Sequence, residues 1–145
     1  HGIITAMNKF YTVDDYKEHQ EKLVAEYNTC LKNKKSTNLY PGLNPNMFMI
    51  STGINDEDFD NLKQIFSQID CNWICIDIAN GYINALSKFC CKVRKEFPDK
   101  IIVAGNVATR EIVEELILNC GIDVVKVGTE PEVNIAFNWI KDILN

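Results

Sequence analysis

Short apolar runs alternate along the chain with longer segments in which apolar residues recur every three or four positions. The short runs are rich in Ile, Val and Met without strict polar alternation, which is typical of strands buried on both faces of a parallel sheet. The predicted strands are Gly2–Met7, Met47–Ser51, Trp73–Ile78, Ile101–Ala104 and Asp123–Val127. The helical spacing predicts helices that begin after Thr12, Asn55 and Thr109, and one over about Asn84–Phe97.

This alternation predicts an α/β fold. A strand, a helix and a second strand in succession form a βαβ unit with parallel strands and a right-handed crossover. Such units build either a TIM (β/α) barrel or a doubly wound sheet, and the pattern alone does not separate the two. A closed barrel has eight strands and about 250 residues, so a barrel sequence of 145 residues is only part of one. We see no domain boundary, and predict one long loop, over Lys32–Asn46.

The composition removes several classes of function. Hydrophobic residues make up 46% and charged residues 24%, which is typical of a globular domain. A formal net charge of −5 disfavours binding to nucleic acid. We find neither a membrane-length apolar run nor a signal-peptide pattern, so we expect a cytoplasmic chain with no membrane contact. The 6 cysteines form no Cys-x-x-Cys, and with 2 histidines they predict free thiols rather than a metal site or a disulfide framework.

Ligand chemistry is expected at the carboxyl ends of the predicted strands, where α/β proteins bind their ligands. Asp77 ends an apolar strand, so its carboxylate needs either a ligand or a structural partner, such as a helix cap or a salt bridge in the barrel mouth. Lys9 could pair with Asp77, meet a cofactor phosphate or remain solvated. Asn106 could offer its amide to a ring substituent or stabilise a turn. The chain has no Gly-x-Gly-x-x-Gly, P-loop or Ser/His/Asp arrangement.

Several of these segments resemble the IMP dehydrogenase/GMP reductase family of TIM barrels. The segments are Ile4–Tyr11, Ile50–Gly53, Trp73–Tyr82, Val93–Pro98, Ala104–Thr109, Val113–Leu118 and Val125–Gly128. The resemblance spans about Ile3 to Gly128, and the form Asp-x-Ala-Asn-Gly-Tyr at Asp77 favours the GMP reductase branch. It implies a partial TIM barrel in which about five parallel strands alternate with helices. Residues 1–145 then form a single (β/α) domain that is incomplete relative to the family barrel.

The resemblance also implies an oxidoreductase of purine metabolism, which reduces and deaminates GMP to IMP and ammonia with NADPH. In the family, a loop cysteine attacks purine C2, and a hydride from the nicotinamide then reduces the covalent intermediate. The positions that match cofactor-contacting residues are Lys9, Asp77, Ile78, Ala79, Asn106 and Thr129. GMP and IMP are the implied ligands, and a homo-oligomer, the family tetramer, is the implied assembly.

The chain departs from the family after Gly128. There the family has a glycine-rich loop that binds a monovalent cation and ends at the nucleophilic cysteine. The two glycine positions are Glu130 and Glu132 here, and the cysteine position is Ile135, so we expect neither the catalytic residue nor the cation. Residues 129–145 instead predict a divergent, amphipathic C-terminal helix. Upstream, Cys120 marks a one-residue insertion before Gly121.

These departures leave the enzymatic status of the chain uncertain. One hypothesis is a GMP reductase-like chain that is inactive alone because its nucleophile is missing. The alternative is a non-enzymatic remnant of the family, which binds a nucleotide or pairs with another chain through the open edges of its sheet. A truncated gene product, and a complete small α/β protein of unrelated function whose tail helix closes the core, are the remaining interpretations.

Overall fold

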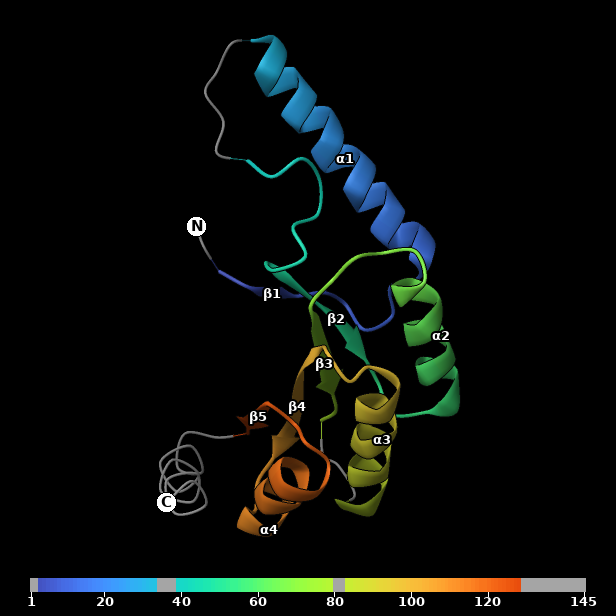
Figure 1. Cartoon of the computed structure of the whole chain (residues 1–145), viewed down its shortest axis with the longest axis vertical. Helices are drawn as coiled ribbons and strands as arrows, with labels where there is room; N and C mark the ends of the chain where they lie inside the picture. Colours follow the sequence, from blue (N-terminus) through green and yellow to red (C-terminus); the bar gives the residue numbers. More distant parts are fainter. Residues whose placement is uncertain (1–2, 34–38, 80–82, 129–145) are drawn as a thin grey trace.

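The computed structural model describes residues 3–33, 39–79 and 83–128, in which five strands alternate with helices. Figure 1 shows the helices along one side of the row of strands. The strands are β1 (Thr5–Ala6), β2 (Phe48–Thr52), β3 (Trp73–Asp77), β4 (Ile101–Val107) and β5 (Val124–Val127). The helices are α1 (Val13–Lys32), α2 (Asp56–Phe66), α3 (Ile83–Glu96) and α4 (Arg110–Glu114), which continues as the π-helical turn η1 (Glu115–Asn119).

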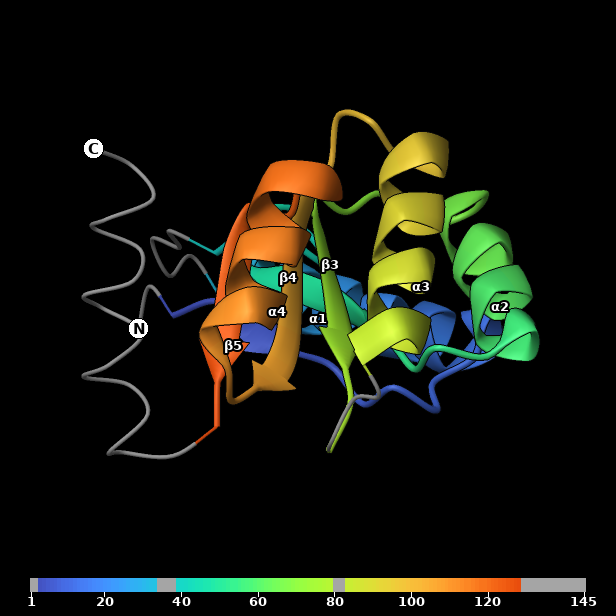
Figure 2. The ribbon, with the colours of Figure 1, turned by 90° about the horizontal axis from the view of Figure 1, so that it is seen from below.

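The order of the strands distinguishes the two architectures that the sequence pattern left open. All neighbouring strands are parallel, and their order across the sheet is β1-β2-β3-β4-β5, the same as along the chain. A doubly wound sheet reverses its order at a switch point, whereas a (β/α) barrel adds each strand beside the last. Figure 2 shows α2, α3 and α4 in a row outside the strands. The predicted partial (β/α) barrel is therefore confirmed.

Two strands differ in length from the prediction by more than one residue. β1 covers only Thr5–Ala6, because it is an edge strand in the described sheet and pairs with β2 alone over two residues. β4 extends to Val107 and thus includes Gly105 and Asn106, which the sequence placed in a turn. The reason is the ladder to β5, which pairs Gly105 with Lys126 and, after an irregularity, Val107 with Val127.

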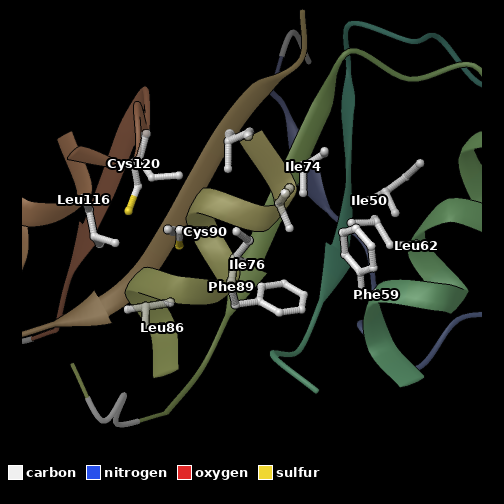
Figure 3. Close-up of a cluster of buried hydrophobic side chains, with 14 of the residues drawn as sticks. Ile50, Phe59, Leu62, Ile74, Ile76, Leu86, Phe89, Cys90, Leu116 and Cys120 are labelled. Carbon is white, nitrogen blue, oxygen red and sulfur yellow. The ribbon is translucent and has the colours of Figure 1, made fainter. Parts of the chain in front are cut away.

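The hydrophobic core lies between the sheet and the helices, as Figure 3 shows. Ile74 and Ile76 alternate along β3, so both point to the same face of the sheet, and both are fully buried. They meet side chains that recur at helical spacing in α2 and α3. The aromatic rings of Phe59 and Phe89 stack edge to face with their centroids 6.0 Å apart. This core fixes α2 and α3 against β3 and so positions the strand ends that bound the candidate site.

α1 begins with the capping box that the sequence predicts, in which the backbone N–H of Thr12 donates to the Asp15 carboxylate at 2.7 Å. Its predicted apolar side is only partly confirmed. Tyr16 is buried, but Leu23 is exposed, because the second half of the helix runs past the sheet (Figure 1). Over the residues that the structure describes, no helix combines the length and the apolar character needed to cross a membrane.

The fourth helix widens into a π-helical turn at its end. In η1 the backbone N–H of Cys120 donates to the carbonyl oxygen of Glu115, five residues earlier, at 3.2 Å. This turn ends beside Cys120, where the family resemblance predicts a one-residue insertion. Cys120 forms a disulfide with Cys91 of α3, so the prediction of free thiols is wrong for this pair. The prediction failed because helix–helix contacts, rather than the spacing along the chain, bring the two residues together.

Candidate functional site

A cavity of about 240 Å³ lies at the carboxyl ends of β1, β2 and β3. Its lining comes from the segments that follow these strands, namely Lys9, Phe10, Gly53, Ile54, Asn55, Asp58, Asp77, Ile78 and Ala79. Four residues singled out from the sequence, Lys9, Asp77, Ile78 and Ala79, therefore lie around one cavity. This is the end of a (β/α) barrel at which ligands bind.

Asp77 forms an ion pair across the sheet with Lys126. The Nζ atom of Lys126 lies 2.6 Å from Oδ1 of Asp77, although β4 separates their two strands. The register aligns Asp77 with Gly105 and Gly105 with Lys126, so the three residues form one row. The ion pair spans that row because Gly105 has no side chain in its path. A Cβ atom there would lie 2.7 Å from Cβ of Lys126 and still closer to its carbonyl oxygen.

Of the interpretations of Asp77, the structure therefore shows a salt bridge in the barrel mouth. Its partner is Lys126 and not Lys9, whose Nζ atom lies 5.5 Å from the ring centroid of Phe10. The side chains of Asp77 and Lys126 are 45% and 32% exposed, so a ligand can reach both. Sequence reasoning missed Lys126, although a lysine between Val125 and Val127 in an apolar strand was a usable signal.

Asn106 lies beside this site without lining the cavity. Its side chain is exposed, and its backbone N–H donates to the carbonyl oxygen of Ile78 at 2.9 Å. The N–H of Ile78 in turn donates to the carbonyl oxygen of Gly105 at 2.9 Å. This pair of hydrogen bonds joins the end of β4 to the segment after Asp77. The other residues singled out from the sequence lie outside the described residues, namely Thr129, Glu130, Glu132, Ile135 and the predicted helix over 129–145.

The β2 side of the cavity is shaped by the start of α2. Gly53 leaves room for the Asp58 carboxylate, which a Cβ atom at Gly53 would overlap. Asp58 accepts a hydrogen bond from the backbone N–H of Asn55 at 3.0 Å and thereby caps α2. The first turn of α2 is acidic, so this helix N-terminus disfavours a phosphate group. Among the described residues that line the cavity, Lys9 supplies the positive charge.

The size and polarity of the cavity fit part of a dinucleotide. Pockets for drug-sized ligands have volumes of about 300–1,000 Å³, so a cavity of 240 Å³ accommodates a ring and a sugar rather than two complete nucleotides. A carboxylate accepts hydrogen bonds from sugar hydroxyl groups, and a lysine beside it can neutralise one phosphate. In the described part of the chain, no group of three or more His, Cys, Asp and Glu residues is arranged to hold a metal ion.

Fold and site together define a (β/α)-barrel unit with a ligand cavity at the carboxyl ends of its strands. The family model described as "IMP dehydrogenase / GMP reductase domain" matches residues 2–133. The chain belongs to this family.

Similar proteins place it near the reductases of the family. The chain is 44% identical over 132 residues to GMP reductase of Aliivibrio salmonicida, and 46% identical over 132 residues to that of Aliivibrio fischeri. It is 45% identical over 131 residues to GMP reductase of Buchnera aphidicola. These matches cover 90% of this chain but only 32–33% of each relative, so the chain spans about a third of their length.

A solved structure supports the fold. The crystal structure of inosine 5′-monophosphate dehydrogenase from Legionella pneumophila superposes with a TM-score of 0.58 and 21% sequence identity. The superposition covers 85% of this chain and 31% of that protein. At this identity the likeness concerns the fold alone.

Proposed function

We propose that this chain carries the cofactor side of a GMP reductase-type site and binds NADPH at the carboxyl ends of β1, β3 and β4. The observation that carries the proposal is the position of Lys9 and Asp77–Ala79 around one cavity, with Asn106 beside it. The similarity to GMP reductases supports the choice of a nicotinamide cofactor over other dinucleotides. The proposal places the chain in the cytoplasm, with the free nucleotides.

Each residue has a separate role in this proposal. Asp77 accepts hydrogen bonds from ribose hydroxyl groups, and Lys126 orients its carboxylate through the ion pair. Lys9 offsets the charge of a cofactor phosphate, and the side-chain amide of Asn106 bonds the carboxamide of the nicotinamide. Ile78 and Ala79 provide an apolar wall. When bound, the cofactor supplies a hydride, which in the family reduces GMP toward IMP.

The chain alone is not expected to carry out the whole reductive deamination. The resemblance puts Ile135 at the position of the family nucleophile, and its side chain cannot form a covalent bond to the purine. Mixing the chain with GMP and NADPH should therefore leave the near-ultraviolet absorbance of NADPH unchanged. A GMP-dependent loss of that absorbance would show that this expectation is wrong.

Binding is tested by titrating the full chain with NADPH and recording the cofactor's fluorescence. We expect Lys9→Ala and Asp77→Asn each to weaken binding by about tenfold, the effect of one lost charge-assisted contact. Lys100→Ala and Asp99→Asn make the same charge changes near the start of β4, at the other end of that strand, and should leave binding unchanged. Equal affinity of the wild type and all four variants for NADPH, or no binding by any of them, would contradict the proposal.

A role as a partner for another chain is the second candidate, and the sheet edges favour it. In the described sheet, β1 and β5 each pair with one neighbour only, which leaves one side of each strand open to further pairing. Light scattering after size-exclusion chromatography distinguishes a monomer from a homo-oligomer. A monomer at every concentration tested would count against this candidate.

A further inference from the structure

We propose that Cys91 and Cys120 form a reversible dithiol/disulfide pair, a modification site that exchanges with small thiols and disulfides of the glutathione class. The two residues lie 29 positions apart in the sequence, with their Cα atoms 4.5 Å apart across the contact between α3 and η1. This separation is at the short end of the range in which a disulfide forms without moving the backbone.

Non-covalent contacts on both sides hold the two thiols together in the absence of the disulfide. One turn before Cys91, the Ser87 hydroxyl donates to Glu115 at 2.7 Å. One turn after it, Arg94 donates to the carbonyl oxygen of Gly121 at 2.9 Å and pairs with Asp123. These contacts join α3 to the segments immediately before and after Cys120. The reduced cysteines therefore have a high effective concentration for each other.

In the reduced state, the buried sulfur atom of Cys120 also has a hydrogen-bond partner. Cys120 is 3% exposed and lies in the core beside Leu116 (Figure 3). As a thiol, its Sγ can donate to the backbone carbonyl oxygen of Ser87, which lies 3.2 Å away. The Cys120 sulfur therefore keeps a hydrogen-bond partner after reduction. Both redox states fit the same fold, which is the condition for a reversible site.

Exposure determines which sulfur reacts with a molecule from solution. Cys91 is exposed, whereas Cys120 is buried. On oxidation, the Cys91 thiolate attacks glutathione disulfide, forms a mixed disulfide and releases one glutathione thiolate. The Cys120 thiolate then attacks Sγ of Cys91 and displaces the second glutathione. In sum, two protein thiols and one glutathione disulfide give one protein disulfide and two glutathione thiols, and reduction follows the same steps in reverse.

The neighbouring cysteine does not compete for this exchange. Cys90 is fully buried, and burial raises the pKa of its thiol to about 12, so almost no thiolate is present at neutral pH. The free Cys30 on α1 is partly exposed and lies far along the sequence from the pair. Cys30→Ser is therefore a matched control for the loss of an accessible thiol.

The test exposes the reduced full chain to glutathione buffers of increasing oxidation, then alkylates it in denaturant and measures its intact mass. We expect the wild type and Cys30→Ser to lose two alkylatable thiols together, without a glutathione adduct. Cys120→Ser should accumulate a glutathione adduct of about 305 Da at Cys91. To form this adduct, the variant should need about tenfold more glutathione disulfide than the wild type needs to form its protein disulfide. Cys91→Ser should gain no adduct at Cys120.

Three results would overturn the proposal. The wild type could retain all 6 thiols in every buffer, Cys91→Ser could oxidise at Cys120 as readily as the wild type, or Cys120→Ser could show no adduct at Cys91. Circular dichroism of each variant confirms that it is folded. If Cys120→Ser does not fold, Cys120→Ala leaves the same accessible Cys91 and has the same expected adduct.

Discussion

Gly105 is the residue on which the ion pair between Asp77 and Lys126 depends. It has a φ of +153°, in the region that favours glycine, and a Cβ atom there would overlap Lys126. We expect Gly105→Ala to lower the free energy of unfolding by about 2 kcal/mol or more, because it combines backbone strain with a clash. Urea denaturation measures the change.

Gly121→Ala is the control for this prediction. Gly121 also has a positive φ, of +66°, but a Cβ atom there would meet Arg94 at an ordinary distance of 3.6 Å. Only backbone strain contributes at this position, so we expect Gly121→Ala to lower the free energy of unfolding by about 1 kcal/mol. If Gly105→Ala cost no more than Gly121→Ala, the close approach of Lys126 would not be a feature of the folded protein in solution.

Glu115 makes the contact between α3 and η1 sensitive to acid. The hydroxyl of Ser87 and the side-chain amide of Asn119 donate to its carboxylate and lower its pKa below the ordinary value of 4.5. Because the folded-state pKa is the lower one, the stabilisation is present above pH 4.5 and is lost as the pH falls through the folded-state pKa.

Glu115→Gln tests this assignment through the pH dependence of stability. The amide cannot gain or lose a proton in this range, so the variant should be less stable than the wild type at neutral pH. The two melting temperatures should converge as the pH falls below the folded-state pKa of Glu115, where the wild-type carboxyl is protonated. A constant difference in melting temperature between neutral and acid pH would contradict the assignment.

At the scale of single residues, Asp77 could be predicted as a site residue from the sequence, but its ion-pair partner could not. A carboxylate after an apolar strand needs a partner for physical reasons, so Asp77 could be selected from the sequence alone. Its partner depends on the register of three strands and on the absence of a side chain at Gly105, which only the assembled sheet shows. Lys9, the partner considered from the sequence, lies near Phe10 instead.

At the scale of elements, the central strands and the helix starts were predictable because their patterns are local. Apolar runs identified β2 and β3 to within a residue, and hydroxyl or amide caps identified the starts of α1, α2 and α4. The ends of β1 and β4 were not predictable, because they depend on pairing with strands distant in the sequence. The π-helical turn and the cysteine pair depend in the same way on packing between helices.

The disulfide should stabilise the contact between α3 and η1. It closes a loop of 29 residues, for which the loss of chain entropy in the unfolded state predicts about 3–4 kcal/mol. We expect the oxidised chain to have a higher urea midpoint than the chain kept in reductant. The double variant Cys91→Ser/Cys120→Ser should unfold at one midpoint in both buffers. If its midpoint shifted as much as that of the wild type, the stabilisation would come from another source.

At the scale of the whole molecule, the sheet is stabilised from its centre outward. β2, β3 and β4 each pair with two neighbours and carry fully buried side chains, whereas both residues of β1 are exposed. In native-state hydrogen exchange, we expect the amides of Ile74, Ile76 and Ile102 to exchange most slowly and those of Thr5 and Met7 to exchange much faster. Equal protection of β1 and β3 would show that the edge is covered in solution.

The barrel architecture was predictable from the alternation of strands and helices together with the family resemblance, but alternation alone allowed two topologies. The consecutive strand order decided between them. It also brings Lys9, Asp77 and Asn106 to the same end of the sheet, because parallel strands align their carboxyl ends. We propose that this end of the sheet binds the cofactor.

Amide NMR spectra of the full chain, recorded during a titration with NADPH, test that claim most directly. We expect saturable shifts for Gly53, Ile78, Ala79 and Asn106, whereas Lys100 and its neighbours at the start of β4 should be unaffected. Asp77→Asn should need about tenfold more NADPH for the same shifts. An unchanged spectrum, or shifts confined to other parts of the chain, would contradict cofactor binding at this end of the sheet.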